Sequence, residues 1–202
     1  RFEDQVNNAV EKAVEKFGGI DIVVNNASAI SLTGTEQTEP KRFDLMHDIN
    51  VRGTFFVTRA CIPHLKKSNN AHILTLSPPI NLDPKWLKSH LAYTISKYNM
   101  SMMALGWAAE LAPFHIASNA LWPRTTIDTA AVRNLLGGEA LVRMSRKPEI
   151  LADAAYYIFS KPSASCTGHC FLDEEVFAAE GITNLDQYAV TPGGTLYNDL
   201  FL

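Results

Sequence analysis

Helix-like and strand-like patterns of apolar residues alternate along this chain. Apolar side chains recur at helical spacing between residues 5 and 17, and Gly18-Gly19 follows where a left-handed helix cap would sit. Strand and helix in alternation predict a parallel sheet with helices on both faces. We therefore expect one doubly wound α/β domain of the Rossmann type over residues 1–202. The further helices are expected over 40–65, 90–111 and 148–160, and the strands over 20–24, 72–76, 115–121 and 169–173.

The expected strands are short, and prolines or polar residues end them. The run over residues 20–24 is apolar without clean alternation, which predicts a strand buried on both faces. The strand over 72–76 ends at Ser77-Pro78-Pro79, because a proline pair cannot donate to a ladder. Ligands of open parallel sheets bind outside the carboxyl ends of the strands. Polar residues at these ends are therefore the first candidates for a site.

Composition and charge narrow the classes of function. The chain has 202 residues, of which 47% are hydrophobic and 19% charged, as in ordinary globular proteins. A net charge of −3 gives no electrostatic reason to expect nucleic-acid binding. No stretch approaches ~18 uninterrupted apolar residues, so we expect no integral membrane segment. Three scattered cysteines favour a reducing compartment, and a cytoplasmic location is the default expectation.

The strongest local signal for chemistry is Tyr93-Thr94-Ile95-Ser96-Lys97. Residues four apart on a helix face the same way, so the Tyr93 hydroxyl and the Lys97 ammonium can share a site. A nearby cation favours the phenolate and lowers a tyrosine pKa from about 10. Such a tyrosine can exchange a proton with an alcohol or carbonyl oxygen. A second pair at this spacing, Tyr157 and Lys161, lies at a helix end before Pro162 and follows no polar strand end.

The motifs around the first pair resemble those of the short-chain dehydrogenase/reductase family. The sequence around these motifs is similar to the hydroxysteroid dehydrogenase-like members of that family and their bacterial relatives. Five family motifs occur in the family's order: Asn25-Asn26-Ala27-Ser28, Asn50-Val51-Arg52-Gly53, Tyr93-x-x-x-Lys97, Asn119-Ala120-Leu121-Trp122-Pro123 with Ile127 and Thr129, and Thr167-Gly168.

This resemblance implies a set of roles for individual residues. Tyr93 would be the general acid/base, and Lys97 would lower its pKa and hold the nicotinamide ribose of NAD or NADP. Asn50 would anchor a water that relays protons from Lys97 to solvent. Asn25 and Ala27 would line the adenosine ribose side of the cofactor. The nicotinamide end would be bordered by Pro123, Ile127 and Thr129.

The sequence departs from the family pattern at several points. The glycine-rich turn that holds the pyrophosphate is absent, so we expect that roughly the first seventy residues of a usual domain, including the first βαβ portion, are missing. The residue that discriminates NAD from NADP would lie in that portion. Pro78 stands where the family has its catalytic serine, so Ser77 takes that role, another polar group substitutes for it, or the activity is weak. Arg124 replaces a glycine and is expected to be solvated or ion-paired, and residues 173–175 are read as a polar strand end.

Other chemistries fit the sequence poorly. Cys166, His169 and Cys170 offer three donors, but no fourth ligand lies at a zinc-like spacing, so we expect no metal site. Ser77 is not in a Gly-x-Ser-x-Gly elbow, which argues against a serine hydrolase.

The sequence thus predicts an NAD(P)-dependent oxidoreductase acting on a small apolar alcohol or carbonyl compound. The alternative is a non-catalytic nucleotide-sensing or scaffold module with a dehydrogenase fold, in which Pro78 marks decayed chemistry. The resemblance also implies a homodimer or homotetramer paired through the long helix. Met100, Met103, Ala104 and Trp107 would supply an apolar face for that pairing, unless they belong to the chain's own core. Relatives of eukaryotic origin can be peroxisomal or mitochondrial.

Overall fold

The computed structural model describes all residues from 1 to 202 and shows a parallel four-stranded sheet between two layers of helices. The strands are β1 (Ile22–Asn25), β2 (His72–Leu76), β3 (Ala117–Trp122) and β4 (Cys170–Leu172), in the spatial order β1-β2-β3-β4. The helices are α1 (Glu3–Phe17), α2 (Pro40–Met46), α3 (Thr54–Leu65), α4 (Pro84–Leu87), α5 (Leu91–Glu110), α6 (Gly138–Arg143), α7 (Glu149–Phe159) and α8 (Asp173–Ala179). Two π-helical segments, His47–Gly53 and Val132–Leu136, and two 3-10 turns, Ala112–Phe114 and Asp186–Tyr188, complete the set.

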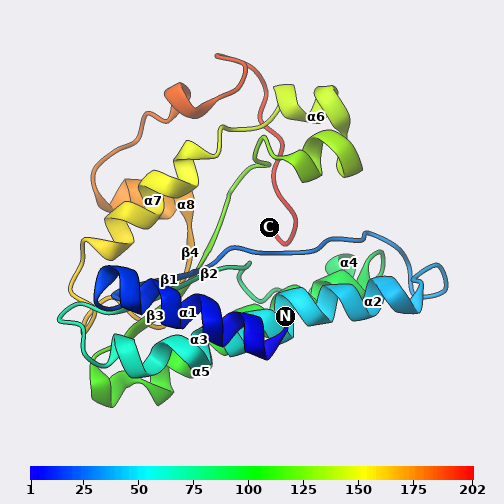
Figure 1. The fold of residues 1–202 in the computed structure, drawn as a ribbon. Coiled ribbons are helices and arrows are strands. Elements are labelled where there is room, and N and C mark those ends of the chain that lie inside the picture. Colours follow the sequence, from blue (N-terminus) through cyan, green and yellow to red (C-terminus); the bar gives the residue numbers. More distant parts are fainter.

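The two helical layers cover opposite faces of the sheet. In Figure 1, α1, α3 and α5 lie on one side of the strands, and α7 and α8 lie on the other. Successive residues of β2 follow this division, because side chains alternate along a strand. Ile73 joins the apolar cluster with α3 and α5, and Leu74 joins the cluster with α7 and α8. The predicted doubly wound α/β class is confirmed.

Strand β1 is at the edge of the sheet and is less buried than the sequence predicts. Val23 is buried towards α3, but Ile22 and Val24, which point to the opposite face, are 43% and 47% exposed. Within residues 1–202, β1 is therefore buried on one of its two faces.

The helix predicted over residues 40–65 is one helical region with a π-helical segment in its middle. Pro40 begins it at a position where the missing N–H costs nothing. The π-helical turn at His47–Gly53 carries the family-motif residue Asn50 and turns its side chain inward, fully buried. The periodicity of apolar residues does not show this insertion.

One further expectation needs correction. Residues 173–175 are not a strand end but the first turn of α8, where three acidic side chains suit the positive end of a helix. Of the two interpretations left open for the apolar residues of α5, the structure supports the chain's own core: Met100, Ala104 and Trp107 are buried, and Met103 is partly buried against the same core. The exposed apolar side chains of α5 include Met102 and Leu105, at 61% and 36% exposure. No helix is long and apolar enough to span a membrane.

Candidate active site

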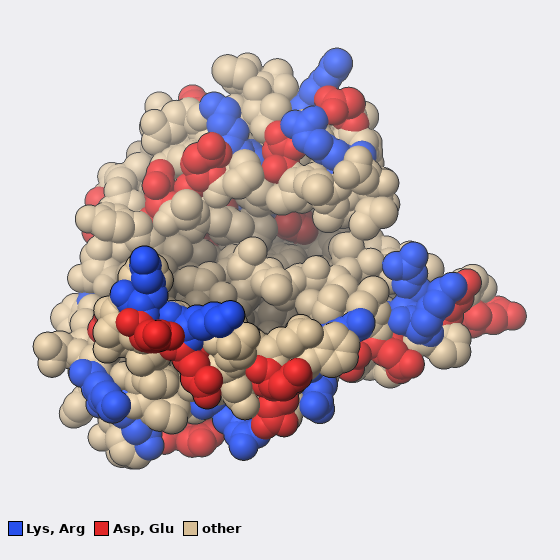
Figure 2. Space-filling model, viewed as in Figure 1, with Lys and Arg blue, Asp and Glu red and all other residues tan.

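A cleft of about 720 Å³ opens at the carboxyl ends of β1, β2 and β3. Sixteen of its twenty-four lining residues are hydrophobic. Figure 2 shows a hollow in the middle of one face, and its visible surface is formed largely by residues other than Lys, Arg, Asp and Glu. This edge of a parallel sheet is where ligands bind, and the volume is that of a small-molecule site.

Tyr93 and Lys97 both line this cleft, as the sequence predicts. They stand one turn apart in α5 and are almost entirely buried, at 5% and 2% exposure. The Lys97 ammonium donates to the carbonyl oxygen of Leu76, at the end of β2, over 2.6 Å. It also lies 5.1 Å from the centre of the Trp122 ring. Strand ends and helix thus bring two proton-transfer groups to one end of an apolar cleft.

The protonation of the pair is governed by burial. Burial raises the pKa of Tyr93 well above its ordinary value, and the negative charge of Asp199 raises it further. Burial lowers the pKa of Lys97 to about 7, against the opposing effect of Asp199. Desolvation is thus the dominant influence on Tyr93 in this arrangement and keeps the phenol protonated at neutral pH, and the lowering of its pKa by Lys97 stays a prediction.

Asn50 holds the segment that follows β1. Its side-chain oxygen accepts from the Ala29 backbone N–H at 2.8 Å, and its side-chain nitrogen donates to the Ala29 carbonyl at 2.9 Å. The same nitrogen donates to the Ser96 hydroxyl at 3.0 Å, in the turn between the catalytic candidates. Both N–H donors of the Asn50 amide are thus used within the chain. A water bound there would have to donate to the Asn50 oxygen.

The end of β2 places Ser77 and Pro78 beside the cleft rather than in its lining. Ser77 is fully buried, and its hydroxyl has no hydrogen-bond partner. The backbone N–H of Ser77 donates back to Thr75, and the Pro78 carbonyl accepts from the Ser101 hydroxyl of α5 at 2.6 Å. A buried polar group without a partner is costly. The Ser77 hydroxyl is therefore available to donate a hydrogen bond to a bound molecule.

The residues after β1 are only partly where the family motif predicts them. Asn25 is buried and donates to the Thr58 hydroxyl of α3 at 3.0 Å, and Ala27 is exposed; neither is among the cleft-lining residues. Their neighbours Asn26 and Ser28 do line the cleft. A one-residue step along an extended chain turns a side chain to the opposite side, which accounts for the difference.

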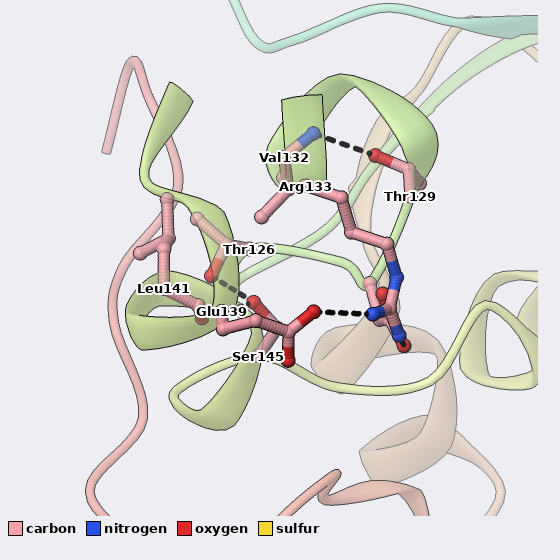
Figure 3. Close-up of polar contacts among 8 residues, drawn as sticks. Thr126, Thr129, Val132, Arg133, Glu139, Leu141 and Ser145 are labelled. Atoms are coloured by element: carbon pink, nitrogen blue, oxygen red, sulfur yellow. Dashed lines mark hydrogen bonds and ion pairs between the residues drawn. The ribbon is translucent and has the colours of Figure 1, made fainter. Parts of the chain in front are cut away.

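The segment after β3 forms another wall of the cleft. Pro123, Ile127 and Thr129 all line it, as predicted. The Thr129 hydroxyl accepts from the Val132 N–H at 3.4 Å, as drawn in Figure 3. Arg124, the departure from the family pattern, lies 3.8 Å from a Glu174 oxygen, which confirms the ion-paired reading.

Polar contacts connect this segment to Glu139 and Ser145, as Figure 3 shows. The Thr126 and Ser145 hydroxyls are 2.8 Å apart. Arg133 pairs with Asp128 at 2.6 Å and with Glu139 at 2.8 Å.

The last residues of the chain form a part of the site that sequence reasoning missed. Asp199 and Leu200 line the cleft together with Tyr93 and Lys97. Phe201 is buried at 1% exposure in a cage of aromatic rings. The rings within 5.3 to 6.3 Å of it are Trp86, His90, Tyr93, Tyr98 and Trp122. The available signal was an acidic residue followed by the apolar run Leu200-Phe201-Leu202 at the end of a polar tail.

The second Tyr-x-x-x-Lys pair lies outside the cleft. Tyr157 packs edge-on against Phe177, and Lys161 forms an ion pair with Glu180 at 2.5 Å. No group of three or more His, Cys, Asp or Glu side chains is arranged to hold a metal ion.

Comparison with known proteins agrees with the arrangement. A family model described as enoyl-(acyl carrier protein) reductase matches residues 1–173. Hydroxysteroid dehydrogenase-like protein 2 from Bos taurus is 59% identical over all 202 residues, which cover 48% of that protein. The chain thus spans about half the length of the curated relatives it matches.

Two solved structures share the fold. A short chain dehydrogenase from Mycobacterium thermoresistibile superposes with a TM-score of 0.92 at 55% identity, over 100% of this chain and 71% of that one. The 3-ketoacyl-(acyl-carrier-protein) reductase from Brucella melitensis, solved as a complex with NADH, gives a TM-score of 0.71 at 30% identity, over 85% of this chain and 72% of that one.

Proposed function

Because the chain belongs to the short-chain dehydrogenase/reductase family, we propose that residues 1–202 form an NAD(P)-binding domain that transfers hydride between nicotinamide and a secondary alcohol or its carbonyl compound. The observation that carries the proposal is the meeting of Tyr93 and Lys97 at one end of an apolar cleft, beside the carboxyl ends of β2 and β3. The apolar lining favours a small apolar alcohol or carbonyl substrate.

The residues at this end of the cleft suit the nicotinamide half of NAD or NADP. An ammonium group has three donors, and Lys97 uses one on the Leu76 carbonyl, which leaves two for ribose hydroxyls. Pro123, Ile127 and Thr129 provide a largely apolar wall for a flat ring. The bound nicotinamide would supply or accept the hydride, which is chemistry that no side chain of this protein can perform.

Tyr93 would move the proton. As hydride reaches the carbonyl carbon, the negative charge develops on the carbonyl oxygen, and the Tyr93 hydroxyl gives its proton to that oxygen. The high pKa of Tyr93 keeps the hydroxyl protonated and favours this direction. Lys97 would stabilise the phenolate left behind. The Ser77 hydroxyl, which has no partner, would hold the substrate oxygen in place of the serine that Pro78 replaces. Asn50 would anchor the relay water through its side-chain oxygen.

The remaining family expectations are part of the same proposal. Asn25 and Ala27 would lie on the adenosine ribose side of the cofactor, next to Asn26 and Ser28, which line the cleft. A homodimer or homotetramer would pair through α5, where Met102 and Leu105 leave apolar surface exposed.

The test is NAD(P)H oxidation by the full-length protein with a panel of ketones and aldehydes. Tyr93→Phe removes only the hydroxyl, and Tyr157→Phe removes the same group from the second pair outside the cleft. We expect turnover by the wild type and Tyr157→Phe, and a loss of about 10²- to 10⁴-fold in Tyr93→Phe. Tight cofactor binding without turnover on any carbonyl would instead favour the nucleotide-sensing or scaffold module.

A further inference from the structure

The Lys97 ammonium lacks a nearby counter-ion on its own helix or on the strands beside it. It is 2% exposed and makes one hydrogen bond, to the Leu76 carbonyl. None of the ion pairs within 4.0 Å involves Lys97. A buried charge is costly unless another charge compensates it. The charged form of Lys97 therefore needs a carboxylate at somewhat longer range.

The carboxylates around this end of the cleft differ in the hydrogen bonds and ion pairs that they already make. On the β3–α8 side, Asp173 is fully buried and one of its oxygens accepts from the backbone N–H groups of Arg124 and Glu174, both at 2.8 Å. Glu174 is held by Arg124 and Arg146. Each of these two carboxylates thus serves the start of α8.

On α5 itself, the titratable neighbours of Lys97 carry no negative charge at neutral pH. Tyr93 is a protonated phenol, and His90 is buried against the Thr94 hydroxyl at 2.9 Å, where desolvation lowers its pKa. The carboxylate that lines the cleft together with Lys97 is Asp199, from the C-terminal segment.

The segment that carries Asp199 is docked by contacts on both sides of it. The Asp199 N–H donates to the Arg124 carbonyl at 3.1 Å, and the Asp199 side chain accepts from the Leu200 N–H at 2.7 Å. The Trp122 indole N–H donates to the Leu200 carbonyl at 3.0 Å. Phe201 fills the aromatic cage that includes the ring of Tyr93, and its backbone enters the left-handed region at φ 77°. A bulky residue adopts that conformation only where its surroundings enforce it.

Charge interactions agree with this geometry. Burial raises the pKa of Asp199 to about 6, and the positive charge of Lys97 opposes that rise. Asp199 in turn opposes the burial that lowers the pKa of Lys97. The two side chains thus favour each other's charged form.

We propose that Asp199 is the counter-ion of Lys97 and a positioning residue of the active site, delivered by the docking of residues 197–202 onto α5. Docking would keep the Lys97 ammonium charged and the Tyr93 hydroxyl protonated, which is the state that carbonyl reduction requires. The role in reduction rests on the proposed function, whereas the pairing with Lys97 does not.

The first test therefore measures Lys97 directly, without turnover. In full-length protein carrying ¹³C at lysine Cε, the pH titration of the Lys97 signal, assigned by its loss in Lys97→Met, gives the ammonium pKa. We expect Asp199→Asn to lower that pKa by about one unit, since the removed charge acts on Lys97 from beyond ion-pair distance through a partly polar medium. Asp199→Glu, which keeps the charge, should stay near the wild type. Glu11→Gln removes an equal charge from the exposed face of α1. In this control variant the Lys97 pKa should equal that of the wild type.

An unchanged or higher Lys97 pKa in Asp199→Asn would overturn the pairing, and so would an equal fall in Glu11→Gln. The second readout is the pH profile of carbonyl reduction. Its alkaline limb should move to lower pH in Asp199→Asn and keep its wild-type position in Glu11→Gln. A lower rate with an unmoved limb would mean a merely structural role for the segment. If the wild type shows no turnover, the proposed function fails while the NMR result still decides the pairing.

Discussion

Replacing Lys97 by methionine should stabilise the cofactor-free protein at neutral pH. The butyl stem of Lys97 packs in the cleft end, and methionine keeps most of that volume without the charge. The wild-type side chain is 2% exposed, and its pKa falls from an ordinary 10.5 to about 7. The unfolded chain binds the Lys97 proton more tightly than the folded chain does. Keeping Lys97 charged at neutral pH therefore lowers the free energy of unfolding.

The size of the effect follows from the same numbers. Each tenfold change in proton affinity is worth ~1.4 kcal/mol, so a pKa of about 7 in place of 10.5 corresponds to about 5 kcal/mol as an upper bound. Water that reaches the ammonium from the open cleft offsets part of this cost, and the substitution leaves the Leu76 carbonyl without its partner, which costs about 1 kcal/mol. We expect a net gain of about 1–3 kcal/mol in the free energy of unfolding at pH 7.

The stabilisation by Lys97→Met depends on pH. Because the Lys97 pKa is depressed in the fold, its cost is fully present below pH 7 and fades as pH rises towards 10.5. Urea unfolding followed by circular dichroism at pH 7 and 9.5 should therefore show a larger gain for Lys97→Met at the lower pH. Lys12→Met, on the exposed face of α1, should show little change at either pH. A Lys97→Met variant that is less stable than the wild type at pH 7, or whose gain is equal at both values, would refute the reasoning.

Two other substitutions probe the residues around the pair. Phe201→Ala empties the aromatic cage and should cost about 3–5 kcal/mol of docking and folding free energy. The loss should be seen as a lower urea midpoint or as proteolysis confined to residues 197–202. Full resistance of that segment to proteolysis would contradict the docking. Ser77→Ala should lower kcat for carbonyl reduction by about 10-fold or more while the cofactor Kd stays constant, because the hydroxyl has no partner within the chain. A kcat equal to that of the wild type would remove Ser77 from the mechanism.

Local sequence patterns predicted the elements of this fold and failed where distant segments decide the outcome. The Tyr93–Lys97 spacing and the strand end at Leu76 are local features, and they meet in the cleft as expected. The π-helical segment His47–Gly53 inside the helical region that follows Pro40 is not encoded in the apolar periodicity.

The C-terminal segment illustrates the same limit at the candidate site. Asp199 comes into the cleft through contacts with residues 75 or more positions earlier, such as Arg124 and Trp122. Burial first, and the Asp199 carboxylate after it, raise the pKa of Tyr93, which the Tyr93–Lys97 spacing alone does not predict. The inward turn of Asn50 likewise arises from a π-helical insertion that apolar periodicity does not register.

The most direct test of the central claim is the rate of NAD(P)H oxidation by Tyr93→Phe at saturating carbonyl substrate, with the cofactor Kd measured on the same samples. The account predicts a rate at least ~100-fold below that of the wild type, at an unchanged Kd, because the phenylalanine ring keeps the packing against Phe201 but cannot give a proton. A Tyr93→Phe rate equal to that of the wild type would contradict it.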